Sequence, residues 1–235
     1  MARFALSKKQ STHTIPKQSL KSEQLLLLVN GNHAPFWDYF MALYSDRFVW
    51  IPLYIAIFYV LLRVMTWRMA LLGLLVCGLI ILFCDQTTSH LIRPYVMRLR
   101  PSQLDNPLSA YVHIVDNYRG GRFGFPSAHS ANTWGLTFFV FFLFRKHILT
   151  GFMVFWALLT CYSRMYLGVH YPTDLLLGML IGFLGASIAY YLFQRYSAYK
   201  RTAAEIPPRH YLVPVVVGLL TMVGILVYAG IANTA

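Results

Sequence analysis

Six long apolar stretches limit what this 235-residue chain can fold into. They lie near 48–66, 69–89, 128–144, 148–166, 174–193 and 211–231. Each is close to the roughly 20 residues that a helix needs to cross the hydrocarbon core of a bilayer. Hydrophobic residues make up 57% of the chain and charged residues only 12%, which excludes an ordinary soluble domain. The sequence predicts an all-α fold, a polytopic membrane helical bundle of about six transmembrane helices in one membrane domain.

The N-terminal part divides into a tail and an interfacial segment. Residues 1–22 form a polar, basic tail, and the membrane domain is expected over 23–235. The apolar "LLLLV" after the tail is shorter than the roughly 7 to 15 residues of a signal-peptide core, so we expect no cleavable signal. Residues 24–46 mix apolar residues with Asn30, Asn32, His33 and Asp38, which favours an amphipathic segment in the membrane interface.

The basic residues indicate an orientation in the membrane. They cluster in three short connections: Arg63 and Arg68; Arg145 and Lys146; Arg195, Lys200, Arg201 and Arg209. Short loops rich in Lys and Arg tend to stay cytoplasmic. Alternation then places residues 90–126, residues 167–173 and both termini on the outer face, although the basic tail conflicts with this placement.

The predicted outer loop over 90–126 is positively charged. It contains Arg93, Arg98, Arg100, Arg119 and Arg122, balanced by Asp105 and Asp116. The planar donor fork of arginine suits phosphate oxygens, so a phosphate ligand explains the loop. Contact with lipid headgroups or local ion pairs is the alternative. The net charge of +12 does not favour nucleic acid, because the cations flank helices and belong to no basic soluble module.

Polar residues stand at the start of an apolar stretch in "FPSAHSANTW", residues 125–134. Pro126 and Ser127 form a plausible helix start, with serine as the cap. The free N–H groups of such a helix start point toward an anion. His129 falls in the first turn, where it can exchange protons with water. A polar N-terminal turn without chemistry is the alternative interpretation.

Two further polar clusters are predicted on the same face. "RPYVMRLRP" carries Arg93 and Arg100, and "CYSRMYLGVHYPTDLLLG" carries Ser163-Arg164, His170 and Asp174. His170 and Asp174 are four residues apart, so the carboxylate can bind one imidazole nitrogen and orient the other. A histidine oriented in this way is a candidate nucleophile.

Together these residues resemble the type-2 phosphatidic acid phosphatase superfamily of membrane phosphatases. Its pattern is Lys-x6-Arg-Pro, then Pro-Ser-Gly-His, then Ser-Arg-x5-His-x3-Asp. The third motif matches fully, Ala128 replaces glycine in the second, and Arg93 replaces lysine in the first. The resemblance covers about 85–193. Arg93 keeps the charge without the compact ammonium, and Ala128 adds one methyl group, so we expect an altered rate or selectivity and retained activity.

The resemblance implies a role for each site residue. His170 is the expected nucleophile, Asp174 its orienting carboxylate, and His129 the general acid and base. The residues expected to bind phosphate are Arg93, Arg100, Ser127, Ala128 and Arg164. We expect no cofactor and no metal in this site, since the residues themselves place few carboxylates near it (Asp105, Asp116 and Asp174).

The family offers several membrane-lipid substrates. We expect a bacterial inner-membrane enzyme whose active site faces outward, with lipid A as the favoured substrate. Undecaprenyl pyrophosphate, phosphatidylglycerol phosphate and phosphatidate are the alternatives. Vanadium haloperoxidases share these motifs but are soluble, and a non-catalytic lipid-binding or transport protein has no evident need of His170 and Asp174. No pattern indicates the oligomeric state.

Residues outside the motifs have less specific expectations. Asp85 is expected to support the site, either by pairing with an arginine or by packing. His33 and Asp38 either shape substrate access or belong to a simple interfacial anchor. Gly178, Gly182 and Gly185 are expected to permit close helix packing.

Overall fold

The computed structural model describes residues 21–196 and 207–234, and its regular elements there are helices. The α-helices are α1 (Lys21–Gly31), α2 (Pro35–Tyr44), α3 (Ile51–Val64), α4 (Trp67–Asp85), α5 (Arg93–Val96), α6 (Ala128–Phe144), α7 (His147–Tyr166), α8 (Pro172–Tyr196) and α9 (Arg209–Thr234). Short 3₁₀ turns cover Arg47–Trp50 and Pro107–Tyr111, and a π-helical segment covers Gln86–Ile92.

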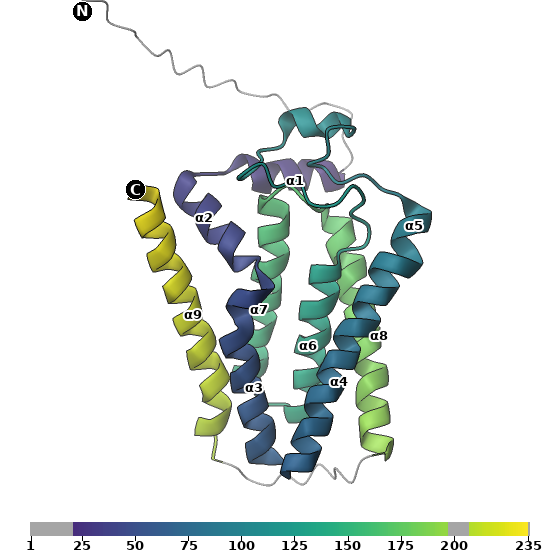
Figure 1. Cartoon of the computed structure of the whole chain (residues 1–235), viewed down its shortest axis with the longest axis vertical. Helices are drawn as coiled ribbons and strands as arrows, with labels where there is room; N and C mark the ends of the chain where they lie inside the picture. The colour runs from purple at the N-terminus through teal and green to yellow at the C-terminus, as the bar shows by residue number, and fades with distance from the viewer. Residues whose placement is uncertain (1–20, 197–206, 235) are drawn as a thin grey trace, which may run out of the picture.

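Helices run side by side as a bundle made of α3, α4, α6, α7, α8 and α9 (Figure 1). Among the described residues, five helical stretches are long and apolar enough to cross a membrane. They are Arg47–Val64, Trp67–Val96, His147–Tyr166, Pro172–Tyr196 and Arg209–Thr234. The sixth, α6, has 17 residues and packs against α4, α7 and α8. The all-α membrane bundle is therefore confirmed, and six is an approximate count of its spans.

Glycines allow α6 and α8 to approach closely. A Cβ atom on Gly178 would lie 2.5 Å from the Ser127 carbonyl oxygen, and one on Gly182 would lie 2.5 Å from the Ala131 carbonyl oxygen. Neither backbone oxygen can move aside without displacing α6. The packing role expected of these glycines agrees with the structure, and it fixes the start of α6 against α8.

The second span is longer than the sequence suggested. Its helix passes Cys84 and continues through the π-helical segment and α5 to Val96. Met97, in the left-handed region at φ 49°, ends it. The loop expected over 90–126 therefore begins only at residue 97, and Arg93 projects from a helix.

The amphipathic segment expected over 24–46 forms two helices. α1 lies across one end of the bundle, and α2 leads from it toward α3 (Figure 1). The fully buried Asn30 fixes α1, because its Nδ2 donates to the carbonyl oxygens of His113 (3.0 Å) and Tyr166 (2.7 Å). Its Oδ1 accepts from the N–H of His113 at 2.7 Å. Residues 1–20 of the expected tail lie outside the described residues.

The two ends of the bundle differ in content. The 97–127 loop, the 167–171 connection, α1 and the end of α9 lie at the upper end in Figure 1. The α3–α4 and α6–α7 connections lie at the lower end (Figure 1). The three motif clusters expected to share one face therefore do share one end of the bundle.

Candidate active site

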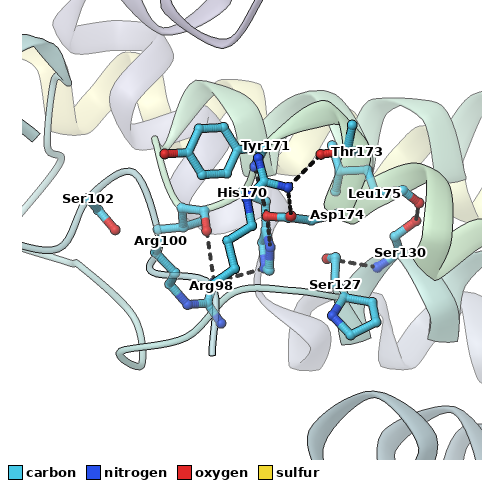
Figure 2. A network of polar contacts seen from close by, with 12 residues as sticks. Arg98, Arg100, Ser102, Ser127, Ser130, His170, Tyr171, Thr173, Asp174 and Leu175 are labelled. Atoms are coloured by element: carbon cyan, nitrogen blue, oxygen red, sulfur yellow. Dashed lines mark hydrogen bonds and ion pairs between the residues drawn. The ribbon is translucent and has the colours of Figure 1, made fainter. Parts of the chain in front are cut away.

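His170 lies in the 167–171 connection, immediately before α8, and its side chain is almost fully buried. Asp174, in the first turn of α8, is also buried. The distance from His170 Nδ1 to Asp174 Oδ2 is 3.3 Å (Figure 2). The same oxygen accepts the N–H of Tyr171 at 2.9 Å. The expected imidazole–carboxylate pair is therefore present.

The second nitrogen of the His170 ring contacts Arg100. Arg100 Nη1 lies 2.8 Å from His170 Nε2 and donates to the Val169 carbonyl oxygen at 3.0 Å (Figure 2). A guanidinium can only donate, so Nε2 must present its lone pair and the ring proton must sit on Nδ1, facing Asp174. This tautomer is the one that a nucleophilic Nε2 requires. Burial, followed by the charge of Arg100, holds the pKa of His170 well below its usual range, so the ring stays neutral.

Arg98 is a site residue that the sequence analysis counted only among the loop cations. Its Nη1 donates to Asp174 Oδ1 at 3.0 Å and to Thr173 Oγ1 at 2.7 Å (Figure 2). Residues near 99 are extended, since Leu99 and Phe123 form an isolated β-bridge. Side chains two apart on an extended segment share a face, so Arg98 and Arg100 reach the same pair of residues. The spacing of two residues between Arg98 and Arg100 is the sequence signal that could have identified Arg98 as a site residue.

The second motif forms the start of α6. Ser127 is the N-cap, and its Oγ accepts the N–H of Ser130 at 3.4 Å. The N–H of Ser127 donates to the Asp174 carbonyl oxygen at 3.0 Å, and Arg93 Nη2 donates to the Pro126 carbonyl oxygen at 3.0 Å. All three motifs therefore contact one another. Ala128 begins the helix, where first-turn N–H groups have no intrahelical acceptor.

Arg164 approaches from the end of α7 and is almost completely buried. Its Nη1 donates to Ser45 Oγ at 2.6 Å, and it also hydrogen-bonds Tyr118. Although burial alone would raise the pKa of Tyr118, the charges of Arg164 and Arg100 lower it. Sequence reasoning missed Ser45 and Tyr118, because neither belongs to a motif and each comes from a segment distant in sequence.

His129 stands where two cavities meet. Both are lined by His129, Ser45, Arg47 and Phe48. The first cavity is the more polar of the two and adds Arg164 and Tyr118, together with Asp46 and Asp116. The second adds mainly apolar side chains of the 47–50 turn, α3, α4 and α7: Trp50, Ile51, Tyr54, Ile81 and Trp156. A polar chamber and an apolar chamber therefore meet at His129, an arrangement suited to an amphiphilic ligand.

The site holds an excess of positive charge with unused donors. In the described part of the chain, the buried Nε atoms of Arg93, Arg100 and Arg164 have no hydrogen-bond partner. Burial lowers the pKa of Arg100 to about 10, and the nearby charges of Arg164 and Arg93 act in the same direction. Arg100 still carries its charge at neutral pH. Three cations whose spare Nε donors are buried favour an anion such as phosphate.

Asp85 contributes in a way that the sequence left open. Its Oδ1 accepts from Asn132 Nδ2 at 3.0 Å, one helical turn beyond His129. The charge of Asp85 also acts on Arg93, and Asp85 lines the apolar cavity beside His129.

His33 and Asp38, with His113, form a separate group. Their possible ligand atoms lie within 4.8 Å of one another, so these residues have the composition and the proximity to hold a metal ion. Their side chains line neither of the two cavities at His129.

Gly124 provides a test of how tightly the site is packed. A Cβ atom there would lie 2.9 Å from Arg100 Cγ and 3.4 Å from Asp174 Oδ2. Gly124→Ala is expected to displace Arg100 and to lower kcat/KM about 10²-fold, as small misplacements in active sites do. Gly121→Ala is the matched control, since its Cβ meets nothing within 4 Å. Equal activity of the two variants would contradict the packing argument.

Arg100 is also expected to set the acid limit of the reaction. A low pKa keeps His170 neutral, and therefore able to attack, at pH values where an ordinary histidine is protonated. Arg100→Gln removes one cause of the low pKa, so the acid limb of the kcat/KM profile should move to higher pH. Arg100→Lys keeps the charge and should move the limb less. An unmoved limb in Arg100→Gln would refute the assignment.

Comparison with known proteins gives one family. The sequence profile of the PAP2 superfamily matches residues 69–198, which contain all three motifs. The chain is 43% identical over 211 residues to a lipid A 4′-phosphatase of Bacteroides thetaiotaomicron, covering 88% of this chain and 94% of that protein. It is 34% identical over 173 residues to a lipid A 4′-phosphatase of Porphyromonas gingivalis, covering 73% of each.

Two more distant similarities were found. A putative undecaprenyl-diphosphatase of Escherichia coli, YbjG, is 30% identical over 140 residues, which cover 54% of this chain and 63% of that protein. The crystal structure of Aquifex aeolicus LpxE superposes with a TM-score of 0.55 at 20% identity, covering 76% of this chain and 99% of that one. At this identity the structural match supports the fold alone.

Proposed function

Since the chain belongs to the PAP2 superfamily, we propose that this membrane phosphatase acts on lipid A, through a covalent phosphohistidine at His170. The 4′-phosphate is the proposed position, because both lipid A phosphatase relatives carry that specificity in their names. The substrate assignment is supported most by the 43% identity over almost the whole length of one of them.

One observation carries the chemistry. His170 is bound on both nitrogens, by Asp174 at Nδ1 and by Arg100 at Nε2. This fixes the tautomer and directs the Nε2 lone pair at the Arg100 guanidinium. A buried neutral imidazole among arginines is suited to attack on an anionic phosphorus centre.

The first step is the transfer of phosphate to His170. The incoming phosphate takes over the Arg100 donor, and Nε2 then attacks phosphorus while the bond to the lipid oxygen breaks. His129, which is protonated once the phosphate anion is bound among the arginines, gives its proton to that oxygen, and the lipid alcohol leaves. Asp174, itself paired with Arg98, stabilises the positive charge that develops on the His170 ring.

The second step hydrolyses the phosphohistidine. His129, now neutral, removes a proton from water, and the resulting hydroxide attacks phosphorus while the bond to Nε2 breaks. Inorganic phosphate leaves, and His129 has regained the proton that it donated. One histidine thus serves as acid and then as base.

Arginines and backbone groups stabilise the transferring phosphoryl group in both steps. Arg93, Arg100 and Arg164 have spare Nε donors, and the N–H groups of Ala128 and His129 are at a helix start. The role of Ser127 is proposed to be indirect, because its Oγ caps α6. These groups supply the charge stabilisation without calling on a metal in either step.

The proposed location is the bacterial inner membrane, with the site on the outer face. The α3–α4 and α6–α7 connections, which carry Arg63 and Arg145, leave from the end of the bundle opposite the site, which supports an inside-positive orientation (Figure 1). The apolar cavity beside His129 would receive acyl chains from the membrane while the phosphate enters the polar cavity.

The decisive experiment is phosphate release by the purified full chain in EDTA. We expect turnover of lipid A with loss of one phosphate, identified as the 4′ group by mass spectrometry, and no turnover by His170→Ala. Loss of activity on chelation, restored by metal, would overturn the metal-free chemistry. Removal of the 1-phosphate instead would overturn the positional assignment alone.

A second substrate class is supported by the similarity to the putative undecaprenyl-diphosphatase. The same two steps would release the terminal phosphate of a lipid pyrophosphate, with the lipid monophosphate as the leaving group. Parallel assays with lipid A, undecaprenyl pyrophosphate and phosphatidate distinguish the two substrate classes. A higher kcat/KM for undecaprenyl pyrophosphate than for lipid A would reverse the proposal.

A further inference from the structure

Two histidines and an aspartate lie close together at the end of the bundle that holds the phosphatase site, but outside that site. His33 lies in the link between α1 and α2, Asp38 lies in the first turn of α2, and His113 follows the 3₁₀ turn at 107–111. His113 Nε2 lies 2.9 Å from Asp38 Oδ2, and the rings of His33 and His113 stack with their centroids 3.7 Å apart. Three separate segments thus contribute one potential ligand each.

The surrounding residues hold two of these ligands in place. Tyr166 donates its hydroxyl to Asp38 Oδ1 at 2.7 Å, and that hydroxyl accepts the N–H of Ala34 at 3.2 Å. Asn30 fixes the backbone of His113 through two hydrogen bonds. Asp38 therefore keeps Oδ2 directed at His113. Metal ligands in proteins are commonly oriented by such outer partners.

We propose that His33, Asp38 and His113 form a binding site for a divalent transition-metal ion, with Zn²⁺ as the best fit. Two imidazoles and one carboxylate are a ligand set that zinc accepts, and three protein ligands leave one position for water. The 2.9 Å between His113 Nε2 and Asp38 Oδ2 is near the separation of about 3.3 Å that two ligands have around a tetrahedral zinc with bonds of about 2.0 Å. The proposal does not depend on the proposed function.

The exposed position of His33 favours this site. The two rings are nearly parallel, at 3°, whereas a shared ion lies close to the plane of each ring. His33 is exposed and sits in a short link, so it is the ring that turns to complete the site.

A bound ion would connect the segments that lie over the phosphatase site. It would cross-link the α1–α2 link, α2 and the 97–127 loop, and through Tyr166 it would act on the end of α7. Arg164 lies two residues before Tyr166, and its partner Ser45 follows α2. We therefore expect metal binding to stabilise the fold and to stiffen one wall of the polar cavity.

The test measures metal directly on the full chain, with any affinity tag removed. After incubation with Zn²⁺ and desalting, we expect about one zinc per chain by mass spectrometry, and Co²⁺ should give the visible absorption of a tetrahedral site. His33→Ala, His113→Ala and Asp38→Asn should lose the ion. His90→Ala, an exposed histidine elsewhere, and the double variant His129→Ala/His170→Ala should keep it.

Two further measurements separate a metal site from a hydrogen-bonded brace. Zn²⁺ should raise Tm in the wild type and leave Tm of His33→Ala unchanged. Tyr166→Phe should weaken zinc binding about 10- to 100-fold, as loss of an outer partner does. No zinc in the wild type, or zinc retained by Asp38→Asn and His33→Ala, would overturn the proposal. Neither readout depends on turnover, so failure here and failure of the phosphatase proposal are distinguishable.

Discussion

His170→Ala is expected to lower kcat on lipid A by about 10⁴-fold or more, the scale at which loss of a covalent nucleophile acts. The physical reason is that the Nε2 lone pair is the atom that forms the bond to phosphorus. Initial rates of phosphate release measure the loss. Tm should fall, because the change removes a buried ring that bonds Asp174 and Arg100, but the Ser127–Asp174 backbone bond that joins α6 to α8 remains and the chain should stay folded.

Its control is Asp174→Asn, which keeps the shape of the side chain and removes the charge. We expect a smaller fall in kcat, since His170 keeps its Arg100 contact and loses the carboxylate that stabilises the ring cation. Rapid acid-free quenching of the wild type with radiolabelled substrate should trap phosphate on histidine. Trapping in His170→Ala at the wild-type level would contradict the assignment of the nucleophile.

Much of the membrane architecture was predictable from local chemistry. Apolar stretches of bilayer length identified the long helices among the described residues, because the spans satisfy their backbone hydrogen bonds internally and must be apolar outside. The end of the second span was wrong because the π-helical turn at 86–92 carries the helix through "QTTSH" into α5. Polar residues look like a loop in a hydropathy pattern, whereas here Thr88 bonds back to the Cys84 carbonyl oxygen.

The motif residues of the site were predicted better than their partners. His170 and Asp174 were recognisable because both fall within one helical turn of each other. Arg98 was not assigned because its partner Asp174 lies 76 residues away and five arginines compete in the same region. Tyr118 and Ser45 gave no signal at all. Contacts between segments that are distant in sequence depend on tertiary packing, and no local sequence pattern indicates them.

The His113 cluster illustrates the same limit in another way. His33 and Asp38 were noted as polar residues in an amphipathic segment, and their spacing alone suggested no ligand set. The third member comes from a loop 75 residues after Asp38. Asn30, which seemed only costly in hydrocarbon, is the residue that brings that loop to α1. A buried amide with its hydrogen bonds satisfied is a structural anchor.

His129→Ala is expected to lower kcat on lipid A by about 10²- to 10⁴-fold, the usual contribution of a general acid or base. The loss should depend on the leaving group, because a lipid alkoxide needs a proton whereas a nitrophenolate does not. With an aryl phosphate ester the variant should transfer phosphate to His170 almost normally. Hydrolysis of the phosphoenzyme should then become slow, since no base remains to activate water.

The two effects predict a kinetic signature for this variant. An aryl phosphate should give a burst of nitrophenol close to one equivalent, followed by a slow steady state, whereas lipid A should give no burst. Asn132→Ala is the matched control: it lies one turn along α6 and alters the Asp85 contact without removing the imidazole. Equal losses on both substrates would mean that His129 binds phosphate instead of transferring protons. His129 would then join the arginines, and another group in the polar cavity, with Tyr118 the nearest in chemistry, would have to protonate the leaving oxygen.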